Sequence, residues 1–539
     1  MSGRTTVTSR RAVLRAAAAG AAVAATASVS SRAASTPSGP GESPTAIVIG
    51  SGFGGAVAAL RLGQAGVQTT VLERGRRWPI SPGGNTFATL NKPDGRAAWF
   101  STKAYINGIM SPPINPYPGL IDRVFGNGVD AIYGAGVGGG SLAFGMFTSV
   151  PRKVDFDMIF PASADYDELV RTYFPRAKQE LGCAPLPADI LAHPQYRGAR
   201  AFLNTLRDYG TEPIPTDFAV DWDIVREELR GRRTASISVG EGPYGVNSGA
   251  KNSVDRNYLP AAEATGNVTI KALHEVFDIR PRAGRKGYVV TAREIDEQHA
   301  TVRVSRFEAD YLFMAAGSYY TTSLLVTARA KGTLPALSTK IGQGWGTNGD
   351  FLIVRTPLRQ DYGAAQGGPG NVKMYEDDLP GGPVAMNYQA TPFPEYAGGF
   401  TTTNLIQTHT DERGTIDYDR ANGQTVLDFP HPRENTLVDQ RASRFAWHFH
   451  DRTEARLGFP ANGIPIFSQA ADFGAACTYH GLGGVVMGQG ADENGRVIGY
   501  DNLFVVDGSF LPGAAGLVNP SLTITAITER TMDRFVATL

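Results

Sequence analysis

Residues 46–75, AIVIGSGFGGAVAALRLGQAGVQTTVLERG, decide the fold of this chain. The continuous apolar run Ala46–Ile49 predicts a short buried strand, and the run rich in alanine and leucine that follows predicts a helix ending near Gly66. A second apolar run, Thr69–Leu72, predicts another strand that ends at Glu73. A strand, a glycine turn, a helix and a strand in this order are typical of a parallel α/β sheet.

The glycines of this turn indicate a phosphate-bearing ligand. Gly50 permits the tight turn, Gly52 lets the backbone approach a pyrophosphate, and Gly55 lets the helix pack closely on the strand. The N–H groups at the start of the helix favour phosphate charge, and Glu73 can accept the two ribose hydroxyls of an adenosine. The stretch predicts a dinucleotide site and leaves NAD and FAD both open.

A second glycine-rich loop, Gly134–Ser141 (GAGVGGGS), is flanked by apolar residues on both sides. It suits backbone that lies flat against a planar ring or a phosphate. The ligand contacts that we expect from it are Gly136, Gly139, Gly140 and Ser141.

Segments far apart in sequence are expected to complete the same sheet. Val268–Ile270 and Val276 read as strands, and Ala309–Ser318 reads as a buried strand that runs into a helix. Residues 79–118 and 363–399 are rich in loop-forming residues and are assigned to a second domain.

Near the C-terminus, Asn502–Ser509 reads as a strand that ends in small polar residues, among them Asp507 and Gly508. Asn519 and Pro520 then precede a helical pattern, with Asn519 expected as the N-cap and Pro520 as the first helical residue. The positive end of this helix dipole would favour an anionic ligand such as a reduced flavin.

The composition fits a folded protein of roughly two or three domains. The chain has 539 residues, of which 42% are hydrophobic, and its 51 acidic and 51 basic side chains cancel. This balance gives no support for a nucleic-acid partner. We expect a monomer that makes at most a transient contact with a membrane surface.

The N-terminal residues 1–34 have a different pattern. Ser9–Arg15 holds a twin arginine, an alanine-rich stretch follows, and the first acidic residue is Glu42. The apolar stretch is too short for a transmembrane helix and is typical of a Tat-type signal peptide. We therefore expect a secreted protein.

Cysteine and histidine patterns predict no metal. Cys183 and Cys477 lie far apart, and the sequence leaves their pairing open. His448 and His450 could face one way on a strand, but no third ligand is in view.

Four motifs together resemble the glucose–methanol–choline (GMC) flavoprotein oxidoreductases. They are the GSGFGG turn with LERG, the GAGVGGGS loop, YHGLGG at 479–484, and NLFVVDGSFLPGAAGLVNPSLTITAITER at 502–530. DRNYLPAA, WFSTKAYI, GTLPAL and GQGWGTNGD make the chain most similar, within that family, to the bacterial cholesterol oxidases with non-covalent FAD. The resemblance extends over nearly all of the chain after residue 34.

The resemblance implies a Rossmann-like FAD-binding domain of GMC type and a second α+β substrate domain built on a mixed or antiparallel sheet. The FAD-binding domain is expected from residues 43–78, 245–345 and 494–539, and the substrate domain from 79–244 and 346–493. The implied FAD contacts are Gly50, Gly52, Gly55, Glu73, Gly136, Gly139, Gly140, Ser141, Val276, Asp507, Gly508, Asn519 and Pro520.

The resemblance also implies the chemistry. His480 would stand over the flavin N5 atom with Asn519 as its neighbour, and its imidazole would accept the proton of a substrate hydroxyl. The α-hydrogen of the alcohol would leave as hydride to the flavin, and O2 would then be reduced to H2O2.

Two positions depart from the family pattern. Gln389 stands where cholesterol oxidases have a glutamate that moves a proton during isomerisation, and a neutral amide cannot do so; Glu395 is the alternative carboxylate. Phe144 replaces an amide that contacts the flavin. We expect Phe393, Tyr396 and Phe400 to line an apolar pocket.

The sequence thus predicts a secreted FAD-dependent oxidase of a hydrophobic secondary alcohol, with a 3β-hydroxysteroid such as cholesterol as the candidate substrate and weak or absent isomerase activity. Three alternatives stay open: a dehydrogenase that uses a quinone or protein acceptor, a non-redox lyase that contains flavin, and a protein that only binds FAD.

Overall fold

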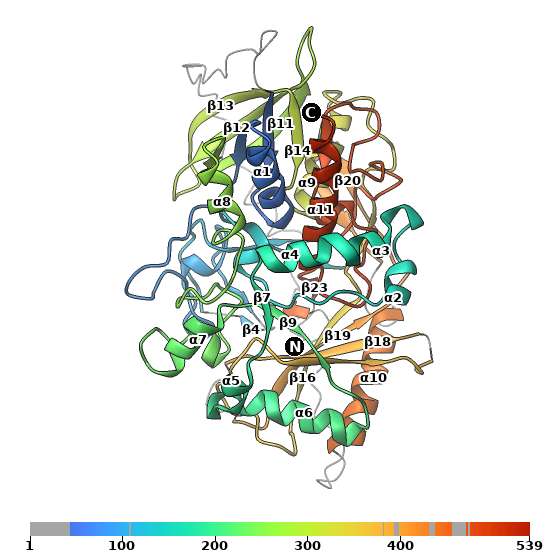
Figure 1. Ribbon diagram of the computed structural model, residues 1–539. Coiled ribbons are helices and arrows are strands. Elements are labelled where there is room, and N and C mark those ends of the chain that lie inside the picture. Colours follow the sequence, from blue (N-terminus) through green and yellow to red (C-terminus); the bar gives the residue numbers. More distant parts are fainter. Residues whose placement is uncertain are drawn as a thin grey trace, which may run out of the picture. The chain divides into compact units, whose positions relative to one another are not determined.

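The computed structural model describes residues 44–106, 109–110, 112–380, 382–392, 398–430, 437–454, 470–472 and 475–539 (Figure 1). The predicted signal peptide lies outside the described residues, as do Phe393, Glu395 and Tyr396. In the described ranges, no helix combines the length and the apolar character that a membrane span requires.

A parallel five-stranded sheet forms the dinucleotide-binding part. Its strands, in spatial order, are β10 (Val268–Lys271), β2 (Gln68–Leu72), β1 (Thr45–Ile49), β14 (Tyr311–Met314) and β24 (Leu503–Val505). Both faces of the central strands are buried, which is why they read as continuous apolar runs. The predicted α/β fold with segments drawn from distant parts of the chain is confirmed.

Helices cover this sheet. The helix α1 (Phe53–Gln64) follows β1 and packs against α11 (Ser521–Val536) and α8 (Tyr258–Ala264), while α9 (Ser318–Ala330) follows β14 (Figure 1). Close contact between α1 and the sheet requires glycine. A Cβ on Gly54 would lie 1.5 Å from the Val506 carbonyl oxygen, and one on Gly55 would lie 2.1 Å from the Gly50 carbonyl oxygen.

The prediction that Val276 belongs to the parallel sheet is wrong. It lies in β11 (His274–Pro281), which pairs antiparallel with β12 (Tyr288–Ile295), and β12 pairs with β13 (Thr301–Ala309) in a separate sheet. Leu273, between β10 and β11, has a left-handed φ of 57°. This backbone turn directs the chain out of the parallel sheet directly after β10.

The second domain is built on an antiparallel sheet, as predicted. Its strands are β16 (Asp350–Arg355), β19 (Thr402–Thr408), β18 (Val384–Gln389), β17 (Val372–Glu376) and β8 (Ile214–Pro215). The helix α10 (Leu437–Glu454) packs on β16, β19 and α6 (Arg197–Tyr209) (Figure 1).

Two sequence interpretations in this domain need correction. Residues 363–399 were expected to be loops, yet they contain β17 and β18; β18 is buried along nearly its whole length, so it shows no alternating pattern. His448 and His450 lie on the helix α10, not on a strand, with His448 exposed and His450 buried. The described residues contain no cluster of potential metal ligands.

Smaller elements complete the described structure. The remaining sheets contain β22 (Ala470–Asp472), β23 (Ala475–Thr478), β6 (Asp130–Gly134) and β5 (Ile121–Val124); β15 (Gln343–Trp345), β20 (Gly414–Asp419) and β21 (Gln424–Asp428); β3 (Tyr105–Ile106) and β4 (Ile109–Met110); and β7 (Cys183–Pro185) and β9 (Asp217–Ala219). The remaining α-helices are α2 (Lys153–Asp157), α3 (Tyr166–Glu168), α4 (Phe174–Glu180), α5 (Ala188–Ala192) and α7 (Trp222–Leu229). Cys183 and Cys477 do not form a disulfide with each other.

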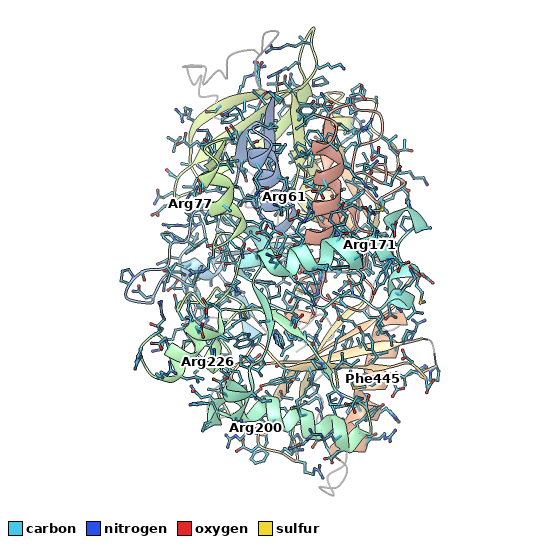
Figure 2. All side chains as sticks on the ribbon, viewed as in Figure 1. Arg61, Arg77, Arg171, Arg200, Arg226 and Phe445 are labelled. Carbon is cyan, nitrogen blue, oxygen red and sulfur yellow. The ribbon has the colours of Figure 1, made fainter. Side chains whose placement is uncertain are left out.

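A buried carboxylate joins α1 to α11. Glu529 of α11 accepts two hydrogen bonds of 2.7 Å from the Arg61 guanidinium and one of 2.8 Å from the Tyr258 hydroxyl. Figure 2 labels Arg61 on α1, beside α11. Because the Glu529 side chain has no exposed surface, its charge depends on these partners.

We predict that Glu529→Gln lowers the free energy of unfolding by up to about 3 kcal/mol, because Arg61 loses its fully buried counter-charge and keeps only the partly exposed Glu180, at 3.1 Å. Urea denaturation followed by circular dichroism measures the loss. Glu263→Gln is the control, since Glu263 forms an exposed ion pair with Arg77 at 2.6 Å that contributes only about 0–1 kcal/mol. Equal losses in the two variants would contradict the prediction.

Candidate functional site

A cavity of about 530 Å³ opens at the carboxyl ends of β1, β2 and β14. Gly50, Glu73 and Ala315, which follow these three strands, line one part of it. Residues of β16, β18 and β19 in the antiparallel sheet line another part. Ligands of open parallel sheets bind at this end of the strands, so the cavity has the position expected for a dinucleotide and its substrate.

Most of the predicted site residues meet in this cavity. Those in its wall are Gly50, Gly52, Glu73, Gly139, Gly140, Val276, Gln389, His480, Asp507, Gly508, Asn519 and Pro520. Gly55, Gly136 and Ser141 lie outside the wall. Gly55 packs against Gly50, and the Ser141 hydroxyl donates to the Gly138 carbonyl at 2.7 Å, so these residues support the wall from behind.

The two glycine loops leave bare backbone facing open space. A Cβ on Gly140 would meet no atom within 4 Å, and one on Gly52 would meet only the Gly139 Cα at 4.0 Å. Gly139 itself has φ of +52°, and a Cβ there would lie 2.7 Å from the Gly52 Cα. The loops therefore touch each other and leave a cradle without side chains, which fits a pyrophosphate and a planar ring.

Glu73 is held in place by the first loop. One carboxylate oxygen accepts from the Ser51 N–H at 3.1 Å and the Ser51 hydroxyl at 2.7 Å, and the other accepts from the Gly75 N–H at 2.8 Å. The side chain is 5% exposed. Its carboxylate thus orders the glycine turn as well as lining the cavity.

The helix α11 begins one residue later than predicted. It starts at Ser521 with Pro520 at the N-cap position, and no side chain caps it, so the expected N-cap role of Asn519 is wrong. Pro520 accepts the first helical bond, from the Ile524 N–H at 2.9 Å. Asn519, Pro520 and Ser521 all line the cavity. The positive end of the helix dipole therefore lies at the cavity wall, as expected.

His480 is paired with a carboxylate that the sequence did not reveal. Its Nδ1 lies 2.5 Å from Oδ2 of Asp350, which is 3% exposed. Because a carboxylate accepts, Nδ1 carries the hydrogen, and Nε2 is left as an acceptor. Asp350 ends the GQGWGTNGD motif and begins β16, but no spacing in the sequence links it to His480.

The other oxygen of Asp350 is also hydrogen-bonded. Oδ1 accepts from the Asn348 amide at 3.2 Å and from the Gln407 amide at 3.0 Å. These bonds fix the plane of the carboxylate and so the direction of the imidazole.

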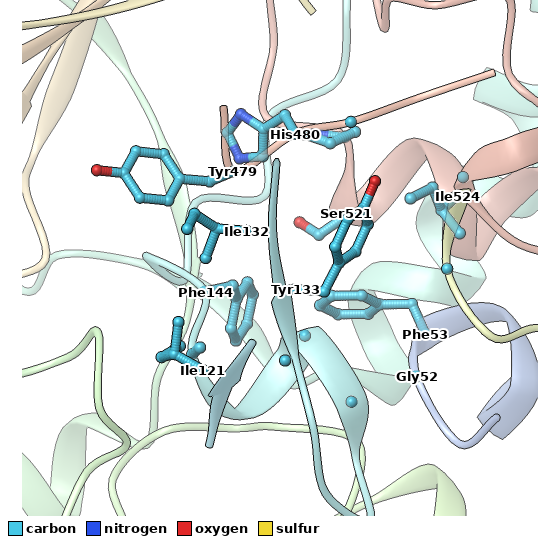
Figure 3. Close-up of a pocket in the computed structure, with 18 of the residues that line it drawn as sticks. Gly52, Phe53, Ile121, Ile132, Tyr133, Phe144, Tyr479, His480, Ser521 and Ile524 are labelled. Carbon is cyan, nitrogen blue, oxygen red and sulfur yellow. The ribbon is translucent and has the colours of Figure 1, made fainter. Parts of the chain in front are cut away.

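Aromatic side chains surround the space beside His480 (Figure 3). Phe53 and Phe144 meet edge to face, with ring centroids 5.2 Å apart. Tyr479 also lines the cavity and is 45% exposed. Phe400 is 49% exposed and lies outside the wall, so the expectation that it lines the pocket is wrong.

Lys251 forms hydrogen bonds to two loops that line the cavity. Its ammonium donates to the carbonyls of Leu142 at 2.8 Å, Phe144 at 2.9 Å and Gly242 at 2.7 Å. Burial lowers the pKa of Lys251 to about 7. The lysine joins the end of the glycine-rich loop to the loop that contains Glu241.

Gln389 and Glu241 are two further polar groups in the wall. Gln389, at the end of β18, lines the cavity and donates a hydrogen bond to the side chain of Asn387. Glu241, which the sequence did not single out, is half-buried and accepts from the Leu90 N–H at 3.0 Å. Burial raises the pKa of Glu241 to about 7, although the Leu90 N–H acts in the opposite direction.

Comparisons with known proteins agree with this architecture. Residues 411–528 match the family model described as GMC oxidoreductase, and residues 48–98 match the NAD(P)-binding Rossmann-like domain. A cholesterol oxidase from Mycobacterium tuberculosis is 27% identical, over 90% of this chain and 89% of its own.

Solved structures share the fold. Pyridoxine 4-oxidase from Mesorbium loti aligns with a TM-score of 0.60 and 17% identity, over 91% of this chain and 99% of that one. A formate oxidase from Aspergillus oryzae RIB40, studied for its FAD modification, aligns with a TM-score of 0.59 and 13% identity, over 92% and 99%. The family model and the cholesterol oxidase relative confirm the resemblance to GMC oxidoreductases, and the solved structures show that the chain shares their fold.

We predict that Gly140→Ala weakens FAD binding at least tenfold, because its methyl group would project into the cradle. The stability of the cofactor-free protein should change little, since this methyl meets no protein atom within 4 Å. Fluorescence titration with FAD measures the affinity. Gly83→Ala is the control and should bind FAD normally, because its methyl would lie outside the cavity wall and make only an ordinary contact, 3.8 Å from Oδ1 of Asn85.

We predict a pH-dependent gain in stability for Glu241→Gln. A carboxyl whose pKa is about 7 when folded and near 4.5 when unfolded stabilises the fold fully below pH 4.5, and this contribution is lost as the pH rises through 7. The free energy of unfolding of the variant, relative to that of the parent, should therefore rise by up to about 3 kcal/mol between pH 5 and pH 8. Urea denaturation at both pH values measures this; the exposed Glu212→Gln should show no such trend.

Proposed function

We propose that this protein is an FAD-dependent oxidase that converts a hydrophobic secondary alcohol to its ketone, with O2 as the electron acceptor and H2O2 as the second product. The observation that carries the proposal is that His480, in the wall of a cavity that also contains the glycine cradle, is hydrogen-bonded to the buried carboxylate of Asp350. An alcohol needs a proton acceptor at its hydroxyl when hydride leaves its carbon.

His480 supplies that acceptor. Its Nδ1–H is held by Asp350, so the Nε2 lone pair is the one available to take a hydroxyl proton. As the imidazole becomes positively charged, the Asp350 carboxylate at 2.5 Å stabilises it. Two amides donate to the second oxygen of this carboxylate and so satisfy it as an acceptor.

Asn519 and the start of α11 provide polar groups in the same wall. Asn519 can hydrogen-bond the hydroxyl oxygen of the substrate, and the α11 dipole favours negative charge that develops nearby. We propose His480 and Asn519 as the two groups that orient the alcohol, with Gln389 as a further polar contact.

The residues that would hold FAD are the cradle glycines, Glu73, Val276, and the Asp507–Gly508 turn. When bound, FAD supplies the hydride acceptor and returns to its oxidised form with O2. Non-covalent binding is part of the proposal, because His480 is turned toward Asp350 and no histidine precedes His193 in the sequence.

An apolar substrate is supported by the rest of the wall. Ile237, Pro243, Leu352, Pro369 and Leu405 line the cavity together with the aromatic rings. The similarity to a cholesterol oxidase favours a 3β-hydroxysteroid such as cholesterol as the first substrate to test. Gln389 is a neutral amide, which cannot carry a proton, so we propose that isomerisation of a steroid double bond is weak.

Export is also proposed, on the twin arginine and alanine-rich stretch of residues 1–34. Fusing residues 1–34 to a reporter that is active only outside the cytoplasm tests it. Loss of the reporter signal on changing Arg10 and Arg11 to lysine is the expected result, and an unchanged signal would contradict Tat export.

We predict that His480→Ala slows reduction of the bound flavin at least 100-fold, because it removes the proton acceptor. Asp350→Asn should slow it by a similar factor, because the amide no longer enforces the Nδ1–H form of the imidazole. Anaerobic stopped-flow mixing with sterols, terpenoid alcohols and polyols, with bleaching of the flavin band as the signal, measures the rate.

The same screen tests the whole proposal. We expect sterols or terpenoid alcohols to bleach the flavin band. If none of the alcohols tested bleaches it, the proposed alcohol oxidation is overturned. After reduction, mixing with O2 should restore the flavin band and release H2O2; a slow reaction with O2 would point to another acceptor. An unchanged rate in His480→Ala would remove His480 from the proton transfer.

A further inference from the structure

The segment Gly346–Asp350, GTNGD, lies between the two parts of the chain that carry the proposed orienting groups. One part is residues 478–482, which contain His480, and the other is residues 513–519, which end at Asn519. Asp350 contacts His480 and Asn348 donates to Asp350, but the contacts of this segment with residues 513–519 have no role in the chemistry described so far.

On one side, GTNGD pairs with the segment around His480. Gly346 and Leu482 exchange two backbone hydrogen bonds of 2.8 and 2.9 Å. The Thr478 hydroxyl donates to the Thr347 carbonyl at 3.2 Å and accepts from the His480 N–H at 3.1 Å. Together with Asp350, these bonds hold His480 at both its backbone and its ring.

On the other side, GTNGD contacts the segment that leads to Asn519. The Asn348 N–H donates to the Gly513 carbonyl at 3.2 Å, and the Asn348 side-chain oxygen accepts from the Ala515 N–H at 2.8 Å. Gly346 passes so close that a Cβ would lie 2.4 Å from the Gly513 carbonyl oxygen.

The Asn348 side chain joins the two sides. Its amide nitrogen lies 3.2 Å from Oδ1 of Asp350 and 3.0 Å from the Val518 carbonyl, so one NH2 group donates to the partner of His480 and to the neighbour of Asn519. The residue is 1% exposed and has a left-handed φ of 63°, a conformation that asparagine tolerates. Only a carboxamide of this length offers both the acceptor and the two donors used here.

We infer that Asn348 is a positioning residue that sets His480 and Asn519 relative to each other. It does so through Asp350 on one side and through the Val518 carbonyl on the other. Without its amide, the two segments keep their separate backbone contacts but lose the group that links them. The kinetic part of this inference depends on the proposed alcohol oxidation, whereas the structural part does not.

Asn348→Gly is the test variant, because glycine adopts the left-handed conformation freely and only the side chain is lost. Asn502→Gly is the matched control. Asn502 also has a left-handed φ, of 60°, and its amide donates one bond, to the Asp310 carbonyl at 3.2 Å, outside the cavity wall.

Hydrogen exchange followed by mass spectrometry, on protein loaded with FAD, is the first measurement. We expect amide exchange in both segments, 478–482 and 513–519, to accelerate by about tenfold in Asn348→Gly. Neither segment should change in Asn502→Gly. Faster exchange in only one segment, or in neither, would overturn the inference.

Anaerobic flavin reduction with the best alcohol is the second measurement. A positioning role predicts that the limiting reduction rate falls by about 10- to 100-fold, while the amount of bound FAD stays at the level of the parent. An unchanged reduction rate would overturn the inference. If none of the alcohols reduces the flavin of the parent protein, the proposed function fails. The hydrogen-exchange measurement then still decides the inference.

Asn348→Asp is the second variant if Asn348→Gly does not fold. It keeps the acceptor for the Ala515 N–H but loses both donors and brings a second carboxylate beside Asp350. The same acceleration of exchange in both segments is expected, and normal exchange in both would overturn the inference.

Discussion

An imidazole in the wall of this cavity lies 2.5 Å from a buried carboxylate that is 130 residues away in the chain. A buried histidine alone can adopt either neutral form, and a buried carboxylate is costly without hydrogen-bond donors. Here Asp350 determines which nitrogen of His480 carries the hydrogen, and the amides of Asn348 and Gln407 donate to Asp350. The direction of the free imidazole nitrogen depends on this bond.

The cofactor side of the cavity depends on the absence of side chains. Gly54 and Gly55 allow α1 to lie against the backbone of the sheet, and Gly139 touches the first glycine turn. Gly52 and Gly140 then present bare backbone to the cavity. The close packing behind the wall and the open space in front of it have the same physical cause, since any Cβ at these positions would either collide with backbone or occupy the ligand's place.

Local patterns in the sequence were enough for the first strand, helix and strand, because burial on both faces and glycine spacing are visible within thirty residues. They were not enough for β18, whose buried length shows no period, or for Val276, whose strand leaves the sheet at a single left-handed residue. His480 and Asn519 could be named from motifs. Asp350 and Glu241 could not, because their importance comes from contacts between distant segments.

The two sides of the cavity differ in how their polar groups are held, and this difference bears on the chemistry. Asp350 lies behind His480 with donors on both oxygens, so its charge is stabilised. Glu241 accepts a hydrogen bond from the Leu90 N–H, and burial raises its pKa to about 7, so near this pH its proton is readily gained or lost. Gln389 cannot titrate at all. A carboxylate held behind the imidazole, with apolar residues such as Leu352 and Leu405 in the same wall, suits a neutral alcohol whose hydroxyl is oriented by His480 and whose body is apolar.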